Sequence, residues 1–378
     1  MNVGLLVVSI GNFGKTGFYN IQEIGFAKAL IEVDKNINVT LYKLVSKKEN
    51  KEEQYIDDTK RIKYVSLPSI KFGTNGIVNI NYLNNNLDVL VIYPSVYQTI
   101  SHVYNWAIKN RIIVYFYIGV LESHSNNKLV KFVLDYYYKK NISLYKKSKC
   151  FAKTPNVKKE LIARGVSEVN LLPVGLDLDL MNRKYYSLNI NLVKNKYGYN
   201  EHDKVILFIG RFTKEKNPIL MLEIFKEALK KNCNYKLLMV GDGELSSAVN
   251  QKIRDFNISE YVNIIKKIQN NKINELYCMS ECIVNLNTNE IFGMSILEAL
   301  YYECKVIALC APGPNYISNE IRCNFLACNT DEIIDKLDKD TYNLRYAHNT
   351  IETYFSWSKQ AERFIDIIKK DYGMLYYD

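Results

Sequence analysis

Short apolar runs alternate with longer amphipathic segments along the whole chain. In the first half, runs rich in Val, Ile, Leu and aromatic residues predict strands at residues 3–10, 37–44, 62–67, 87–94, 111–118, 149–153 and 169–175. In the second half, similar runs predict strands at residues 204–210, 236–243, 262–268, 282–287, 305–310 and 324–328. Most of these runs are apolar at successive positions, which is typical of strands buried on both faces of a parallel sheet.

Apolar residues at helical spacing lie between several of the predicted strands, at residues 18–33, 95–110, 218–231 and 245–256. Strands that alternate with helices predict the α/β class, and two such series predict two doubly wound, Rossmann-like domains. We expect the domains to span residues 1–178 and 179–355, with the polar, weakly periodic residues 176–203 at their junction. The last helical segment has no strand after it, so residues 356–378 are free to cross back onto the first domain.

Composition agrees with a globular protein and excludes several other classes. The chain has 378 residues, of which 48% are apolar and 24% are charged. No apolar run reaches the roughly 18 residues that a membrane span requires, and the first residues do not resemble a secretory leader. The eight cysteines include no C-x-x-C pair, which indicates reduced thiols rather than a metal or disulfide site. We therefore expect a cytoplasmic protein.

Positive charge is concentrated in the first half of the chain. Residues 1–180 contain 24 Lys and Arg against 15 Asp and Glu, and the whole chain carries a net charge of +10. Within this half, the stretch from Lys128 to Lys149 holds seven lysines, one acidic residue and apolar residues near helical spacing. Two interpretations stay open: a helix that lies on an anionic membrane surface, and a solvated helix packed on the sheet. Nucleic acid is a weaker candidate because no recognised motif accompanies the patch.

A glycine-rich turn with Gly11, Gly14 and Gly17 follows the first predicted strand. The sequence Gly-Lys-Thr at 14–16 is the ending of a P-loop, but a P-loop has a glycine five positions before Gly14, where this chain has Ser9. We therefore expect a turn whose backbone closely approaches a ligand, and not a triphosphatase site.

Cationic side chains follow the first predicted strand of the second half. Gly210 and Arg211 stand at the end of that strand, and Lys216 follows five residues later. Ligands of parallel sheets bind at the carboxyl ends of the strands, where a guanidinium and an ammonium could hold a diphosphate. Gly241 opens a similar tight turn after the next strand.

The stretch NTNEIFGMSILEAL at residues 287–300 carries two carboxylates around a glycine turn. Glu290 lies on the loop after a strand, and Gly293 allows a sharp turn into a helix whose first N–H groups can face an anion. Glu298 lies on that helix among apolar neighbours, so we expect it to be buried. Carboxylates accept strongly from hydroxyl groups, which suits sugar or ribose recognition.

These segments resemble the retaining nucleotide-sugar glycosyltransferases of family 4, which have the GT-B fold of two Rossmann-like domains facing a deep cleft. The resemblance rests on G-R-F-T-K-E-K-N, V-G-D-G-E, E-I-F-G-M-S-I-L-E-A-L and L-L-P-V-G-L-D. It covers nearly the whole chain and is strongest between residues 165 and 315. Residues 19–30 and 311–317 also resemble bacterial members that build capsule, exopolysaccharide or other surface glycans. The chain departs from the family at residues 302–305 and 312–314, near the donor pocket.

The resemblance implies roles for individual residues. Arg211 and Lys216 would neutralise the donor diphosphate, and Glu290 would contact the donor sugar beside the reacting carbon. Glu298 would accept from the ribose hydroxyls, and the base would lie near Ile268. The full implied donor-binding set is Gly14, Gly210, Gly241, Ile268, Phe292, Gly293, Met294, Ser295 and Glu298. His124 and Glu122 are candidates on the acceptor side, although an ordinary surface role for His124 is an open alternative.

The resemblance also implies a metal-independent reaction with no cofactor, because protein cations can stabilise the leaving diphosphate in place of a divalent ion. We interpret the D-x-D sequence at Asp177 to Asp179 as structural. The expected activity is sugar transfer from a nucleotide diphosphate to a glycan or lipid-linked acceptor, at the inner face of the plasma membrane if the lysine stretch docks there. Two alternatives are a nucleotide-sugar epimerase and a non-catalytic, membrane-associated sugar-nucleotide binding protein.

Overall fold

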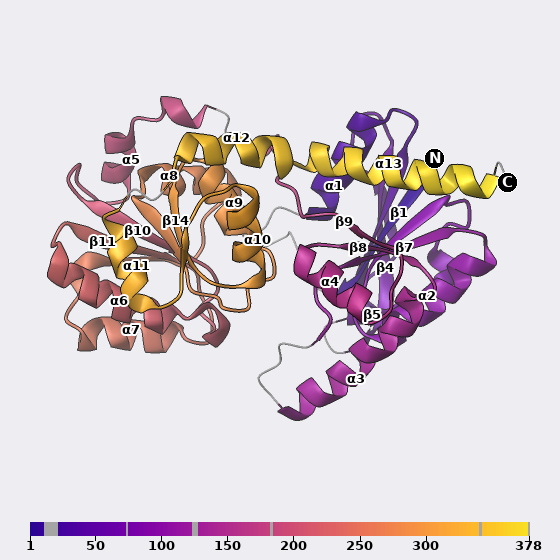
Figure 1. Ribbon diagram of the computed structural model, residues 1–378, viewed down its shortest axis with the longest axis horizontal. Helices are drawn as coiled ribbons and strands as arrows, with labels where there is room; N and C mark the ends of the chain where they lie inside the picture. Colours follow the sequence, from indigo (N-terminus) through magenta and orange to yellow (C-terminus); the bar gives the residue numbers. More distant parts are fainter. Residues whose placement is uncertain (11–21, 73–74, 123–127, 182–183, 340–341, 377–378) are drawn as a thin grey trace. The chain divides into compact units, whose positions relative to one another are not determined.

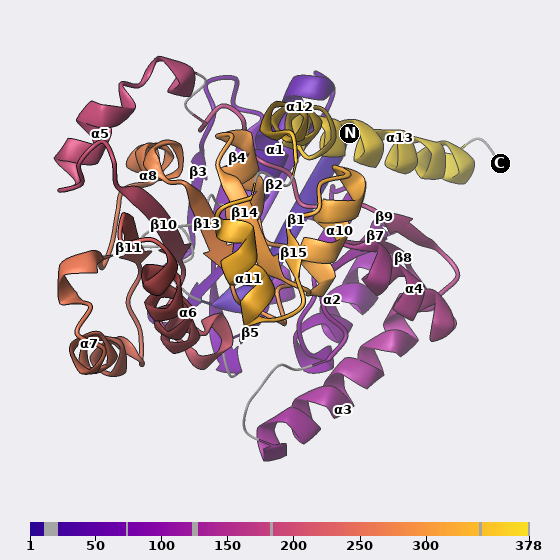
Figure 2. The same cartoon turned by 60° about the vertical axis from the view of Figure 1, so that its left-hand side comes forward.

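The computed structural model describes residues 1–10, 22–72, 75–122, 128–181, 184–339 and 342–376. It divides the chain into two compact units (Figures 1 and 2). Unit 1 contains Met1–Gly175 together with Trp357–Asp378, and unit 2 contains Leu176–Ser356.

Unit 1 is a sheet covered by helices on both faces. Its strands are β1 (Asn2–Ile10), β2 (Asn38–Ser46), β3 (Glu52–Tyr55), β4 (Ile62–Phe72), β5 (Asn75–Ile77), β6 (Val89–Tyr93), β7 (Ile113–Ile118), β8 (Lys149–Ala152) and β9 (Val169–Leu171). Its helices are α1 (Gln22–Val33), α2 (Tyr97–Lys109), α3 (Lys128–Tyr145), α4 (Pro155–Ala163) and α13 (Trp357–Tyr376), with a 3₁₀ turn, η1, at Ile80–Tyr82.

The central strands of unit 1 run parallel in the order β4-β2-β1-β6-β7-β8-β9. In this register Leu5 of β1 lies between Leu41 of β2 and Val91 of β6. β3 pairs antiparallel with β4, and β5 pairs antiparallel with β4 and β1. These two short strands are not predicted by the apolar pattern. Helices α1 and α13 cover one face of the sheet, and α2, α3 and α4 cover the other (Figure 1).

The last helix packs into the core of unit 1. Phe364 of α13 lies with its ring centroid 5.3 Å from those of Phe26 on α1 and Phe151 on β8. Tyr115 on β7 adds a ring 6.2 Å away. The expectation that the final helix crosses back to the first domain is therefore confirmed.

Unit 2 is built of strands β10 (Lys204–Ile209), β11 (Tyr235–Val240), β12 (Val262–Ile265), β13 (Cys282–Asn285), β14 (Lys305–Leu309) and β15 (Leu326–Ala327). Its helices are α5 (Ile190–Lys196), α6 (Pro218–Lys231), α7 (Ser246–Asp255), α8 (Ile273–Met279), α9 (Met294–Tyr301), α10 (Pro312–Glu320), α11 (Thr330–Leu337) and α12 (Leu344–Tyr354). Short 3₁₀ turns are η2 (Tyr185–Ser187), η3 (Lys214–Lys216), η4 (Ser259–Tyr261) and η5 (Asn270–Lys272). Thus η2 and α5 fold within the segment expected to be a weakly periodic junction.

The sheet of unit 2 is parallel throughout, in the order β12-β11-β10-β13-β14-β15. The chain winds outward from β10 through β11 and β12, and then from β13 in the opposite direction through β14 and β15. The direction of winding therefore reverses between the neighbouring strands β10 and β13, and the chain leaves these two strands toward opposite sides of the sheet. Such a reversal, or switch point, opens a crevice at the carboxyl ends of the strands. The topology therefore places the two most promising sequence motifs on neighbouring loops.

All thirteen strands predicted from the sequence are present in the two units. No helix in the described part of the chain is long and apolar enough to cross a membrane.

Candidate ligand site at the carboxyl edge of the second sheet

The loop after β10 carries Arg211 and the short turn η3, which ends at Lys216. Asn217 then adopts a left-handed conformation, with φ of 53°, and Pro218 begins α6. The Asn217 side chain donates to the carbonyl of Leu286 over 2.9 Å. This hydrogen bond ties the loop after β10 to the loop after β13, which fixes the position of Lys216 beside that second loop.

Lys216 and Glu290 meet across the switch point. The Lys216 Nζ lies 2.7 Å from the Glu290 Oε2, and the two side chains are only 17% and 16% exposed. The resemblance implies phosphate as the partner of Lys216 and a sugar hydroxyl as the partner of Glu290, and it does not predict their contact. The pair brings a cation and a hydroxyl acceptor to one point at the carboxyl edge of the sheet.

Two asparagines that no sequence motif singles out hold the Glu290 carboxylate. Asn287 Nδ2 donates to Glu290 Oε2 over 3.2 Å and also to Glu215 Oε1 over 3.2 Å. Asn285 Nδ2 lies 3.4 Å from the same Glu290 oxygen. Asn287 is 1% exposed, and its Oδ1 accepts from the backbone N–H of Asn289. Glu290 is therefore fixed by groups other than Lys216.

Replacing Asn287 with leucine is expected to lower the free energy of unfolding by about 1–3 kcal/mol. The substitution removes the donor to two carboxylates and leaves the Asn289 N–H without its acceptor. Urea unfolding measures the effect, with the exposed neighbour Asn289→Ala as the matched control, expected to change stability by less than about 0.5 kcal/mol. Equal stability of the two variants would show that Asn287 does not organise this loop.

Gly293 turns the chain from the Glu290 loop into α9. Its φ of 96° lies in the left-handed region that favours glycine. Gly293 is the N-cap of α9 and has no side chain that could accept from the first N–H groups of the helix. The N–H groups of Met294 and Ser295 are therefore oriented to bind an acceptor. The preceding Phe292 is buried, with its ring 6.1 Å from Phe355. Only the backbone of Phe292 is thus suited to ligand contact.

A close backbone approach supports the same loop from α10. A Cβ at Gly313 would lie 2.3 Å from the carbonyl oxygen of Phe292, and the Gly313 N–H donates to the carbonyl of Glu290 over 2.9 Å. The Pro-Gly-Pro sequence that departs from the family pattern therefore still provides a glycine where the backbones touch. Gly241 is equally constrained, because its Cβ would lie 1.9 Å from the carbonyl oxygen of Gly210.

Glu298 is buried on α9, as its apolar neighbours predict. The hydroxyl of Tyr277 on α8 donates to Glu298 Oε2 over 2.8 Å. Burial raises the pKa of Glu298 to about 7, and the hydrogen bond from Tyr277 opposes that rise. Near neutral pH this carboxyl can therefore be either an acid or a carboxylate. Tyr277, like the two asparagines, carries no signal in the sequence that selects it.

The other predicted residues are less constrained. Arg211 is exposed, and its side chain forms no ion pair or hydrogen bond within the described ranges. Ile268 is half-buried on the loop after β12, at the same edge of the sheet. In unit 1, Glu122 is 63% exposed and lies 3.7 Å from Lys131. Gly14, with its neighbours in the glycine-rich turn, and His124 lie outside the described residues.

The D-x-D sequence has a local structural role. The Asp177 side chain accepts from the Asp179 backbone N–H over 3.2 Å, and Asp177 is buried. Among the residues that the structure describes, no group of three or more His, Cys, Asp or Glu side chains could hold a metal ion.

Comparison with known proteins finds a family model that matches part of the chain, within the second unit. Residues 189–352 match the family model described as "Glycosyl transferases group 1". The chain is 26% identical over 141 residues to alpha-monoglucosyldiacylglycerol synthase of Acholeplasma laidlawii, covering 37% of this chain and 35% of that protein. It is 32% identical over 134 residues to the amylovoran biosynthesis glycosyltransferase AmsD of Erwinia amylovora, covering 33% of this chain and 37% of that protein. The chain thus spans about a third of the length of the curated relatives that it matches.

The solved structures extend the likeness over both units. The structure of Anabaena Alr3699/HepE in complex with UDP-glucose matches with a TM-score of 0.70 and 14% identity, over 98% of this chain and 100% of that chain. At this identity the match establishes the fold, which is GT-B.

Proposed function

We propose that this chain, whose residues 189–352 match the family model of the glycosyl transferases group 1, transfers a sugar from a nucleotide diphosphate to a glycan or lipid-linked acceptor. The transfer retains the anomeric configuration and serves the synthesis of a surface polysaccharide or a glycolipid. The observation that carries the proposal is the contact of Lys216 with Glu290 at the switch point. The contact supports the proposal because it brings together a cation suited to a diphosphate and a carboxylate suited to a sugar hydroxyl. The names of the relatives support a lipid or polysaccharide acceptor.

In this proposal the donor diphosphate replaces Glu290 as the partner of Lys216. Lys216 and Arg211 then stabilise the negative charge that develops on the diphosphate as its bond to the anomeric carbon breaks. Glu290, still held by Asn285 and Asn287, accepts a hydrogen bond from a sugar hydroxyl. The acceptor oxygen bonds to the anomeric carbon on the same face, and its proton passes to the departing phosphate oxygen.

Nucleotide binding and turnover test the proposal in two steps. Thermal stabilisation of the full chain by UDP, GDP and ADP identifies the base, with UDP the first candidate because the similar Anabaena structure contains UDP-glucose. The matching sugar donors are then incubated with and without bacterial lipid extract, with a chelator present. We expect nucleoside diphosphate release that requires the extract and a labelled sugar in the lipid or glycan fraction. Release at the same rate without acceptor would indicate hydrolysis or epimerisation, and binding without release would indicate a non-catalytic protein.

We further propose that α3 docks unit 1 on an anionic lipid surface where the acceptor resides. Leu129 and Phe132 are 79% and 76% exposed, and Val133 and Tyr136 continue the same helical stripe as exposed apolar residues. A stripe of this length is unusual on a solvent-exposed helix, because it gains no burial in water. Lysines at positions 128, 139 and 140 lie on the same helix and match anionic head groups, whereas Lys131 is paired with Asp135 and Glu122.

Replacing Phe132 with serine is expected to weaken binding to phosphatidylglycerol vesicles by at least about tenfold, because an inserted Phe side chain contributes about 1.5–3 kcal/mol. Leu192→Ser is the matched control, since Leu192 is another exposed apolar helical residue but lies on α5 of unit 2. Co-sedimentation measures both variants at low and high salt. Docking by α3 is ruled out if the two variants bind vesicles equally or if lipid charge has no effect.

A further inference from the structure

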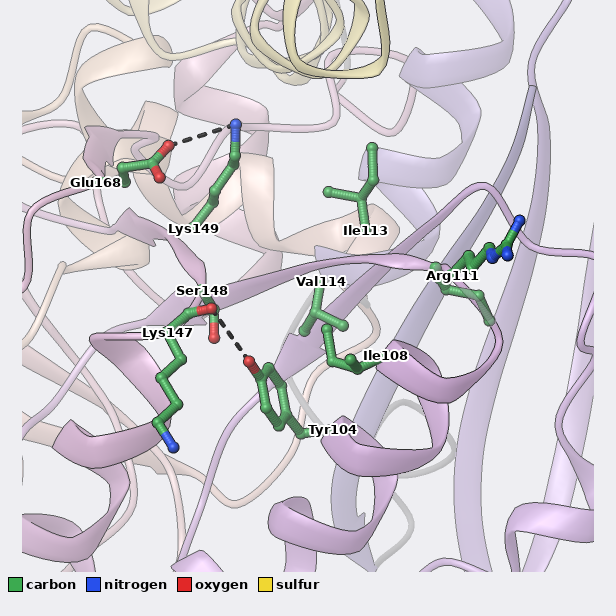
Figure 3. Close-up of a pocket in the computed structure, with 10 residues that line it drawn as sticks. Tyr104, Ile108, Arg111, Ile113, Val114, Lys147, Ser148, Lys149 and Glu168 are labelled. Atoms are coloured by element: carbon green, nitrogen blue, oxygen red, sulfur yellow. Dashed lines mark hydrogen bonds and ion pairs between the residues drawn. The ribbon is translucent and has the colours of Figure 1, made fainter. Parts of the chain in front are cut away.

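Unit 1 contains a pocket of about 580 Å³ whose lining residues belong neither to the candidate ligand site nor to the α3 stripe (Figure 3). Ile113 and Lys149 are the first residues of β7 and β8, and Glu168 directly precedes β9. The pocket therefore opens at the amino ends of the strands. Ligands of doubly wound sheets bind at the carboxyl ends, so this pocket is not part of the donor site.

The pocket has an apolar interior. Tyr104 and Ile108 line it from α2, Ile113 lines it from the start of β7, and the almost fully buried Ile112 and Val114 lie behind them. Ile108 is 51% exposed although it is a large apolar side chain. The hydroxyl of Tyr104 donates to the carbonyl of Lys147 over 3.1 Å, which joins α2 to the segment after α3. The interior thus offers pre-formed apolar surface to a chain-like or ring-like group.

The rim of the pocket is cationic. Figure 3 shows Lys147 and Lys149 on one side and Arg111 on the other, with Ile108, Ile113 and Val114 between them. Lys149 is already neutralised, because its Nζ lies 2.6 Å from Asp371 of α13 and 3.3 Å from Glu168. The side chains of Arg111 and Lys147 form no ion pair or hydrogen bond with other described residues. Two cations are therefore available to an anion at the mouth.

Arg111 has a backbone conformation that is unfavourable for residues with a side chain. Its φ is 59°, in the left-handed region where glycine is favoured. A glycine would fit the turn between α2 and β7 with less strain, but it would remove the guanidinium from the pocket.

We propose that this pocket binds an amphipathic anion, an alkyl chain with a single carboxylate or phosphate head group. The chain lies on Ile108 and Ile113, and the head group pairs with Arg111. The assignment does not depend on the sugar-transfer activity or on the α3 stripe, because it uses neither set of residues.

Calorimetry with the full chain tests the site, with dodecanoate below its micellar concentration as the probe. We expect one dodecanoate per chain, bound at least tenfold more tightly than 1-dodecanol, and no detectable binding of acetate. Lysophosphatidylglycerol with the same chain length is the second arm. If lysophosphatidylglycerol competes with dodecanoate, the pocket accepts a membrane lipid. If it does not compete, the pocket binds only free fatty acids.

Matched variants locate the binding. Arg111→Gly is expected to weaken dodecanoate binding at least fivefold without loss of thermal stability. Arg322→Gly is the control, because Arg322 also has a positive φ, of 51°, but lies in unit 2. Ile108→Glu should abolish binding, and Phe132→Ser should leave it unchanged, which separates the pocket from the α3 stripe. Equal affinity for dodecanoate and dodecanol, or equal effects of the two glycine variants, would overturn the proposal.

Discussion

Replacing Lys216 with alanine is expected to weaken nucleoside diphosphate binding by about 1.5–3 kcal/mol, or roughly 10- to 150-fold. Two effects add in this variant. The diphosphate loses a charged hydrogen-bond donor, and the Glu290 carboxylate, which is only 16% exposed, loses its counter-ion beside an incoming anion. Asn285 and Asn287 keep Glu290 in place, so the remaining carboxylate repels the diphosphate instead of turning away.

Calorimetric titration with the diphosphate selected by the stabilisation screen measures this effect. Lys214→Ala is the matched control, because Lys214 is an exposed lysine of the same turn, η3, with no contact to Glu290 in the described structure. An unchanged dissociation constant in Lys216→Ala, or an equal loss in both variants, would remove Lys216 from the phosphate site.

Glu298→Gln is expected to stabilise the ligand-free protein above pH 7 by on the order of 3 kcal/mol. Burial raises the pKa of Glu298 from 4.5 to about 7, so the folded state holds a proton that the unfolded state has released. The free energy of unfolding therefore falls as the pH rises from about 4.5 to 7. Above pH 7 the full cost of keeping the buried Glu298 carboxylate charged is present. Glutamine mimics the protonated acid, can accept from Tyr277 and avoids the cost, so the advantage of the variant should vanish near pH 4.

The same substitution should weaken nucleotide binding, because a neutral amide accepts from ribose hydroxyls less strongly than a carboxylate. Stability and affinity then change in opposite directions, as expected for a residue retained for binding at the expense of stability. Denaturation and titration at pH 5, 7 and 8.5 measure both quantities. The nucleotide's own phosphate titration affects wild type and variant alike, so their difference isolates Glu298. If affinity is unchanged while stability rises, Glu298 has only a structural role.

The fold was predictable because most of its strands are apolar and buried on both faces. The two missed strands lack that signal for separate reasons. β3 has the sequence EEQY, is exposed at all four positions and pairs antiparallel at the edge of the sheet. β5 is three residues long and contains Gly76. Such strands form because a neighbouring strand offers backbone hydrogen bonds, so their own sequences do not predict them.

The candidate site was predictable where the chemistry is local in sequence. Glu290, Gly293 and Glu298 follow one another along a loop and a helix, and the burial of Glu298 follows from its neighbours. The hydrogen bonds from Asn287 to Glu290 and from Tyr277 to Glu298 are different, because asparagine in a loop and tyrosine in a helix are ordinary residues. Their importance depends on which backbone turns bring the acceptor within reach. The Lys216–Glu290 contact likewise depends on the strand order of the sheet, which apolar patterning does not specify.

The return of α13 to unit 1 has a consequence for recombination. The chain completes its first unit only after it has built the whole of the second, so a truncated chain that stops after Gly175 would leave Phe26, Tyr115 and Phe151 without their packing partner, Phe364. A chimera that takes its second unit from another protein of the same fold must therefore be joined at two points, one on each side of residues 176–356. The second unit is therefore an insertion within the first unit. A fusion that joins a foreign second unit after Gly175 and omits α13 would expose the aromatic residues of the first unit to water.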